Sequence, residues 1–305
     1  MTRKDGLLAL LVVVVWGLNF VVIKIGLNGV PPLLLAALRF LFVVFPAIFF
    51  VPRPRVPLPL LLGYALTISF GQFAFLFCAL NLGMPAGLAS LVLQAQAFFT
   101  IVIGVFIFGE RLQRKQIIGI SLAVLGVLIL AEASMTGQDV KLLGFMLTLA
   151  AAFCWASGNI FNKKIMLCSS TSGIMSLVVW SALIPILPFA LSSWIFEGST
   201  VISQSLQHLN LTTALSVAYL SFIASIVGYG IWGSLLGRYE TWRVAPLSLL
   251  VPVVGLASAA LLLGERLSII QLFGAVLVMA GLFINIFGFR LPIGRVDNVK
   301  KYPVK

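Results

Sequence analysis

Long apolar segments follow one another along almost the whole chain, separated only by short polar stretches. Ten can be drawn, near residues 7–27, 33–51, 59–81, 85–108, 115–133, 142–162, 174–196, 212–236, 242–263 and 271–289. Each contains roughly the 20 residues with which an α-helix crosses about 30 Å of hydrocarbon. Only 9% of the residues are charged, against about 25% in soluble domains. We therefore predict an all-α membrane protein with ten transmembrane helices.

The first apolar segment is expected to remain in the mature protein. It is longer than the apolar region of a signal peptide, no small-residue cleavage site follows it, and Pro31-Pro32 leads directly into the second segment. We therefore count it as the first membrane span.

A repeated motif indicates that the chain is an internal duplication. The tetrapeptide Gly-Glu-Arg-Leu occupies 109–112 and, 155 residues later, 264–267. The match continues downstream, with Gln116, Gly119, Leu122 and Gly126 corresponding to Gln271, Gly274, Leu277 and Gly281. Because five spans separate the copies, the two halves have opposite orientations in the membrane. We predict inverted five-helix repeats at 5–133 and 142–289 around a central cavity, followed by a basic cytoplasmic tail at 290–305.

Basic residues lie mainly on one side of this ten-span arrangement. With the N-terminus in the cytoplasm, 16 of the 20 lysines and arginines fall in cytoplasmic segments and two, Lys141 and Arg266, in outer segments. The other two, Lys24 and Arg39, fall within spans. This bias predicts that both termini are cytoplasmic. The basic residues are interspersed between apolar segments and form no nucleic-acid-binding motif, so the net charge of +12 indicates membrane lipids, and not nucleic acid, as partners.

Two interpretations of the repeated Gly-Glu-Arg-Leu motif are open. It could form a gating element at the ends of the fourth and ninth spans, or it could mark a helix boundary at which the charges anchor or cap. We favour the helix-boundary interpretation, since interfacial charges usually have that role.

Polar and aromatic residues within the spans are the candidate contacts for a solute, because polar groups at membrane depth tend to face a cavity or a partner helix. We expect a cavity lined by parts of spans one, three, four, six, eight and nine. Pro252 removes a bond to the carbonyl of Ser248 and leaves an acceptor at mid-depth. Hydrogen bonding between helices is the alternative role for each polar candidate. The predicted substrate-binding residues are Trp16, Asn19, Arg39, Gln72, Gln94, Gln96, Asn159, Asn162, Tyr229, Trp232 and Ser248.

Arg39 has two possible roles in the second span. It could bind a substrate carboxylate bidentately, or it could have a structural role, extending to the outer surface or pairing with backbone carbonyls. No acidic residue lies in a neighbouring span to pair with it. We favour the structural role, since the outer surface is within reach of its long side chain, and keep Arg39 among the candidates.

Several kinds of chemistry are missing from the sequence. All eight acidic residues fall in termini, loops or span ends, and the single histidine, His208, lies in an outer loop. No Walker motif, metal-ligand cluster or nucleophile–base set is present, which argues against an enzyme and against a bound cofactor. The three cysteines are expected to act as small hydrophobic residues. An amide-rich interior without a buried acid favours neutral, zwitterionic or weakly acidic solutes. Energy coupling and oligomeric state stay open.

Several segments resemble the drug/metabolite transporter superfamily, EamA type. They are Trp16-Gly17-Leu18-Asn19-Phe20, Leu38-Arg39-Phe40, the two Gly-Glu-Arg-Leu motifs, and 245–248 with 250–252. The resemblance implies a five-plus-five inverted bundle that works by alternating access. The segments 91–100, 158–166 and 237–263 are most similar to members that export cysteine-pathway metabolites.

This closer resemblance implies an exporter of small neutral amino-acid metabolites in the bacterial inner (cytoplasmic) membrane. Its small-molecule substrates would be cysteine and O-acetylserine, with asparagine and glutamine as further candidates. The alternatives are an exporter of another small solute, such as a drug or a nucleobase, and a membrane protein without transport function.

Overall fold

The structure is a computed structural model that describes residues 1–109, 111–136, 142–168 and 173–287. These residues form helices and connecting segments and contain no strand. Ten helical spans are long and apolar enough to cross a membrane: Arg3–Gly26, Pro32–Phe49, Leu58–Asn81, Ala86–Phe108, Arg114–Ser134, Leu142–Cys168, Ile174–Phe196, Leu211–Arg238, Pro246–Leu263 and Ile269–Phe287. The predicted all-helical fold with ten spans is therefore confirmed. The predicted basic tail, 290–305, lies outside the described residues.

Four spans each consist of one continuous helix, and the other spans consist of shorter helices. The continuous helices are α1 (Arg3–Gly26), α7 (Arg114–Thr136), α8 (Leu142–Cys168) and α16 (Ile269–Phe287). The second span contains α2 (Pro32–Val44) and η1 (Ala47–Phe49), the fourth α5 (Ala86–Val92) and α6 (Ala95–Phe108), and the seventh α9 (Ile174–Leu183) and α10 (Ile186–Phe196). The ninth contains η4 (Ala245–Leu249) and α15 (Leu250–Leu263), preceded by α14 (Thr241–Val244).

The third and eighth spans both change to π-helix in the middle. The third consists of α3 (Leu58–Tyr64), η2 (Ala65–Gly71) and α4 (Gln72–Asn81), and the eighth of α12 (Leu211–Ala218), η3 (Tyr219–Val227) and α13 (Gly228–Arg238). These are equivalent spans of the two repeats. A π-helical turn inserts an extra residue and is often found near functional sites. The two repeats therefore share this departure from regular helix.

The fourth and ninth spans also break at equivalent positions. Gln94 precedes α6 and Leu249 precedes α15, and these residues are separated by the same 155 positions as the two Gly-Glu-Arg-Leu motifs. The duplication inferred from a tetrapeptide thus extends to the backbone. The second repeat also contains the helix α11 (Ser199–Gln207), which lies between its second and third spans.

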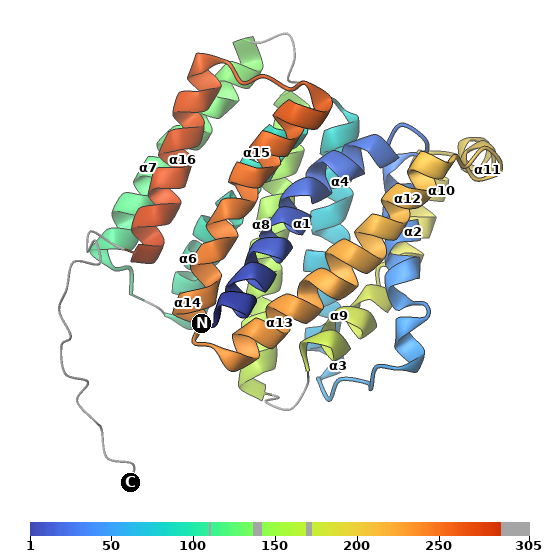
Figure 1. Cartoon of the computed structure of the whole chain (residues 1–305), viewed down its shortest axis with the longest axis horizontal. Coiled ribbons are helices and arrows are strands. Elements are labelled where there is room, and N and C mark those ends of the chain that lie inside the picture. Colours follow the sequence, from blue (N-terminus) through green and yellow to red (C-terminus); the bar gives the residue numbers. More distant parts are fainter. Residues whose placement is uncertain (110, 137–141, 169–172, 288–305) are drawn as a thin grey trace.

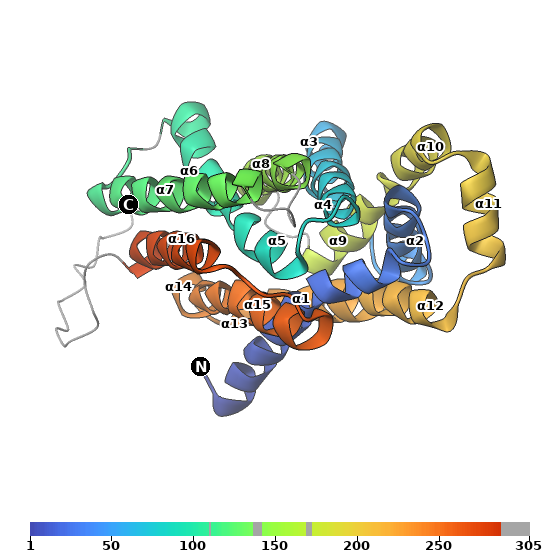
Figure 2. The same ribbon diagram turned by 90° about the horizontal axis from the view of Figure 1, so that it is seen from above.

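Helices α7 and α16 lie side by side at one edge of the bundle (Figures 1 and 2). They approach through glycines: a Cβ at Gly281 would lie 2.5 Å from the carbonyl oxygen of Gly119, and a Cβ at Gly126 would lie 2.7 Å from that of Gly274. The duplication matches Gly119 with Gly274 and Gly126 with Gly281. Each contact therefore maps onto the other, as expected if an approximate twofold axis passes between the two helices.

Replacing Gly281 by alanine is expected to destabilise the protein by about 1–3 kcal/mol, because the new methyl group collides with backbone atoms that cannot move independently. The measurement is the thermal unfolding midpoint of the purified protein in detergent. Gly237→Ala is the matched control, since that helical glycine has open space at its Cβ position. An equal midpoint for the two variants would contradict the close packing of α7 against α16.

Candidate functional site

A small cavity lies among spans two, three, seven and eight. Its volume is about 40 Å³, well below the roughly 300 Å³ at which ligand pockets begin. Its lining includes one charged residue, several hydroxyl groups and aromatic rings. The residues are Arg39, Phe40, Val43, Tyr64, Ile68, Ser69, Phe73, Val178, Ser181, Ala182, Ser225 and Tyr229.

The lining spans of this cavity differ from those predicted for the substrate cavity, which stay a prediction. Spans three and eight contribute as expected, whereas spans two and seven replace spans one, four, six and nine. The physical reason is that some of the amide groups that suggested the other spans bind one another. The Asn159 amide donates to Gln96 Oε1 (2.9 Å) and to Thr100 Oγ1 (3.1 Å), which joins α8 to α6. The polar groups of the cavity are instead a guanidinium and hydroxyls.

Arg39 is the charged residue of this cavity, and its side chain is buried, with 3% of its surface exposed. It therefore does not extend to the outer surface, and the favoured structural role by that route is wrong. Its Nη2 donates to Ser225 Oγ (3.1 Å), and its Cζ lies 4.2 Å from the ring centroid of Phe73. Among the described residues, its Nε and Nη1 have no hydrogen-bond partner. A buried guanidinium with unused donors is suited to receive an anion.

The π-helical turn of the eighth span fixes the position of Arg39. Ser221 Oγ donates to the backbone carbonyl of Arg39 (3.0 Å), and Ser225 Oγ donates to the carbonyl of Leu220 (2.8 Å) while accepting from the guanidinium. Two hydroxyls of η3 therefore fix both the backbone and the side chain of this residue. Sequence reasoning did not identify Ser221 or Ser225 as partners of Arg39, although both lie in the same span as Tyr229.

Trp16 of the first span packs against the eighth span, next to the cavity residue Tyr229. Its Nε1 donates to the carbonyl of Ala224 (3.0 Å), and its ring centroid lies 5.2 Å from those of Tyr229 and Trp232. Of these three predicted aromatic residues, only Tyr229 lines the cavity. Trp16 packs against both Tyr229 and Trp232 and so supports the part of the cavity wall that Tyr229 forms.

The other predicted ligands lie outside the lining of the cavity. Buried Asn19 and partly buried Asn162 each have an Oδ1 without a partner among the described residues, and Gln72 is buried on α4. Gln94 lies at the break before α6 and Ser248 lies in η4. Contact of these residues and of Gln96 and Asn159 with a substrate stays a prediction.

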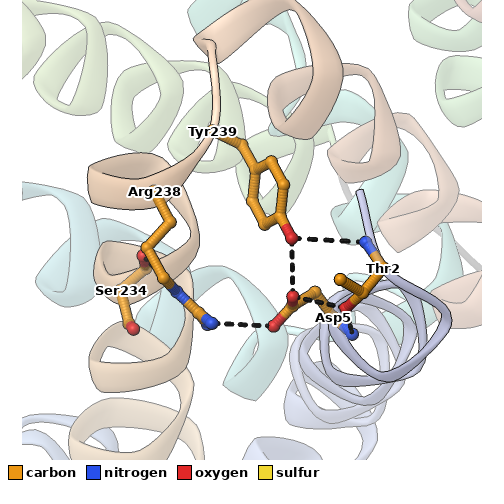
Figure 3. A network of polar contacts seen from close by, with 5 residues as sticks. All are labelled: Thr2, Asp5, Ser234, Arg238 and Tyr239. Carbon is orange, nitrogen blue, oxygen red and sulfur yellow. Dashed lines mark hydrogen bonds and ion pairs between the residues drawn. The ribbon is translucent and has the colours of Figure 1, made fainter.

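Polar contacts join the two repeats at the end of the bundle that contains the N-terminus (Figure 3). Asp5 of α1 accepts from the hydroxyl of Tyr239 (2.6 Å) and lies 3.0 Å from Arg238 Nη1. Thr2 Oγ1 also donates to Asp5, and the Thr2 amide donates to the Tyr239 hydroxyl (3.2 Å). The Asp5 side chain is only 7% exposed, whereas that of Arg238 is 51% exposed. The first and eighth spans are therefore linked at this end.

A second link between the repeats lies at the opposite end of the bundle. Glu265, from the second Gly-Glu-Arg-Leu motif, accepts from Lys24 Nζ (3.0 Å) and from the backbone amides of Ala86 (2.8 Å) and Gly87 (2.9 Å). It thus caps the start of α5, where an anion is favourable. This geometry agrees with the helix-boundary interpretation for Glu265, whereas Glu110 of the first motif lies outside the described residues.

Glu197 makes a similar link that the sequence did not suggest. Its carboxylate accepts from the amides of Leu33 (2.6 Å) and Leu34 (3.1 Å) at the start of α2, and Ser193 donates to it (2.6 Å). A carboxylate of the second repeat therefore caps a helix of the first at this end too.

Comparison with known proteins gives a family match over both halves of the chain. The model of the EamA-like transporter family matches residues 5–131 and again residues 142–287. The chain is 74% identical over 291 residues to a probable amino-acid metabolite efflux pump of Salmonella typhimurium, and 72% identical over 290 residues to one of Escherichia coli; each alignment covers 95% of this chain and 97% of the relative.

More distant similarity supports the same architecture. An uncharacterized transporter of Archaeoglobus fulgidus is 28% identical over 92% of this chain and 98% of its own length. A solved crystal structure, 20% identical, superposes with a TM-score of 0.62 over 92% of this chain and 96% of that one. At this identity the superposition shows the fold alone.

Proposed function

This chain belongs to the EamA-like transporter family, and from that premise we propose that it exports small neutral amino-acid metabolites across the bacterial inner membrane. Cysteine and O-acetylserine are the proposed principal substrates, with asparagine and glutamine as further ones. The printed names of the Salmonella and Escherichia relatives, amino-acid metabolite efflux pumps, support this substrate class. The distribution of basic residues supports cytoplasmic termini.

The observation that carries the proposal is the buried, incompletely paired guanidinium of Arg39. A cation buried in a membrane protein without an acidic partner is unfavourable unless another anion approaches it. The α-carboxylate shared by these metabolites supplies that anion, and it can accept from Nε or from Nη1, which have no hydrogen-bond partner among the described residues. A cationic drug would instead be repelled by the same charge.

Hydroxyl groups of the cavity complement the other charged group of a zwitterion. Ser69, Ser181, Tyr64 and Tyr229 line the cavity together with Arg39, and each hydroxyl oxygen has lone pairs that can accept from an ammonium group. The Phe73 ring, over which the guanidinium lies, walls this region with apolar surface. The set suits a solute that carries one positive and one negative group close together.

Alternating access accounts for the small size of the cavity. A volume of about 40 Å³ is too small for a whole amino acid, so the helices must separate before a substrate can enter. The Asp5 and Glu265 links join opposite repeats at the two ends of the bundle. We propose that breaking one of these links opens the region around Arg39 to one side of the membrane.

Efflux from proteoliposomes preloaded with labelled cysteine or O-acetylserine tests the proposed function. We expect release faster than from protein-free liposomes, with competition by asparagine and glutamine. An imposed pH gradient separates proton antiport, which it accelerates, from facilitated diffusion, which it leaves unchanged. Absence of protein-dependent release for all four compounds would contradict the proposed substrates.

A further inference from the structure

A larger apolar groove lies between α6 and α8, away from the Arg39 cavity. Its volume is about 290 Å³, and the described residues that line it all belong to these two helices. Ile103 and Ile107 belong to α6, whereas Phe153, Ile160 and Phe161 lie on one face of α8. Ile107 and Phe153 are 50% and 51% exposed. Because the described walls belong to α6 and α8, and α6 lies at the periphery of the bundle (Figure 2), we expect the groove to face the hydrocarbon of the membrane.

One end of this apolar groove is basic. Lys164 completes its lining near the end of α8 and is partly exposed. It takes part in no hydrogen bond or ion pair among the described residues. The adjacent Lys163 differs, because its Nζ lies 4.3 Å from the ring centroid of Phe108 at the end of α6. The groove thus combines a long apolar wall with a cation at the membrane interface.

Among the described residues, two acidic side chains of this end of the bundle form contacts elsewhere. Asp5 lies in the network with Arg238 and Tyr239, and Glu240 lies 3.4 Å from Arg243. Neither belongs to the groove lining. Of the described residues, therefore, none neutralises Lys164, and its ammonium group is available to an anionic group.

We propose that this groove binds an anionic phospholipid of the inner leaflet, with an acyl chain along the apolar wall and the phosphate group at Lys164 Nζ. Both parts of the ligand follow from chemistry, since hydrocarbon favours the isoleucine and phenylalanine side chains and a phosphate favours an interfacial lysine. A zwitterionic lipid would match the wall equally well, but its own ammonium group would oppose the lysine. The assignment to the inner leaflet rests on the proposed orientation.

Native mass spectrometry of the full-length protein, with phosphatidylglycerol or phosphatidylethanolamine added at equal concentration, tests this site. We expect the wild-type protein to retain phosphatidylglycerol preferentially. Lys164→Gln should lower that retention by about fivefold, the effect of one basic residue at an anionic surface, and leave phosphatidylethanolamine unchanged. Lys115→Gln is the control, since Lys115 is basic, lies at the same end and does not line the groove.

A second variant tests the apolar part of the site. Ser157 lines the groove and is partly exposed, so Ser157→Phe should fill the groove and lower retention of both lipids without disturbing the core. Equal retention of the two lipids by the wild-type protein would overturn the proposal. So would unchanged phosphatidylglycerol retention in both groove variants. Because the measurement reports lipid binding and not efflux, its failure would leave the proposed transport function untouched.

Discussion

Replacing Arg39 by glutamine is expected to lower the initial rate of cysteine efflux from proteoliposomes by about 30-fold or more. Removing one partner of a buried, hydrogen-bonded charge pair typically weakens binding by about 2–5 kcal/mol, and a factor of ten corresponds to about 1.4 kcal/mol. Among the described residues that line the cavity, this guanidinium is the one charged group, so no other of them can replace it as the partner of a carboxylate.

Stability should change differently from transport in the Arg39→Gln variant. Without substrate, the guanidinium is a buried charge, and two of its nitrogens have no partner among the described residues, so removing the charge should leave the unfolding midpoint unchanged or raise it. Added cysteine should stabilise the wild-type protein and not the variant. Arg39→Lys keeps the charge but cannot bind bidentately, so its rate should lie between the two.

Arg3→Gln is the control for this series, since Arg3 is exposed at the start of α1. It should transport cysteine at the wild-type rate. Efflux at the wild-type rate in Arg39→Gln, measured in protein that remains folded, would contradict a role for this guanidinium in binding the substrate.

Weakening the two links between repeats is expected to bias the transporter in opposite directions. Asp5→Asn weakens the contacts with Arg238 and Tyr239 at the N-terminal end, whereas Glu265→Gln weakens the contact with Lys24 and the cap of α5 at the other end. A hydrogen bond to a charged group contributes about 1.5–3 kcal/mol. Because Arg238 is half exposed, solvent reduces that value, and we expect a population shift of about tenfold.

The accessibility of a cysteine in the cavity measures this bias. Ser69 lines the cavity and is buried, so Ser69→Cys in a protein lacking the three natural cysteines can be labelled with a membrane-impermeant maleimide from either side. Asp5→Asn should raise the labelling rate from the cytoplasmic side, and Glu265→Gln the rate from the outer side.

Glu240→Gln provides a control for the loss of a carboxylate. Glu240 is 67% exposed and pairs with Arg243 within the same repeat, so its loss should not change labelling from either side. A rise on the same side for Asp5→Asn and Glu265→Gln would contradict the assignment of the two links to opposite gates.

Hydropathy and one repeated tetrapeptide were enough to predict the architecture. Spans could be located because each apolar segment has the length that a bilayer imposes, and the motif at 109 and 264 related the halves. The π-helical turns in spans three and eight had no comparable signal, because the extra residue of a π-turn leaves the apolar composition of a span unchanged. The turn in span eight positions Ser221 and Ser225, so the contacts of Arg39 with these two serines could not be predicted.

The lining of the cavity could be predicted from the sequence only in part. The sequence identified Arg39 and Tyr229 as groups that are expensive or unusual at membrane depth, and both line the cavity. It also favoured amides, but whether an amide faces a cavity or another helix depends on contacts such as Asn159 with Gln96. The contact between Asp5 and Arg238 joins positions far apart in the chain, and local pattern contains no information on such pairs.

The most direct test of the account compares two competitors for exchange of labelled cysteine in proteoliposomes: unlabelled cysteine and its methyl ester, which lacks the carboxylate. If Arg39 binds the carboxylate, cysteine should inhibit the wild-type protein at concentrations about 30-fold lower than the ester. In any residual exchange by Arg39→Gln, the two compounds should inhibit alike. Equal inhibition of the wild-type protein by cysteine and by its ester would contradict the claim that the buried guanidinium recognises an amino-acid carboxylate.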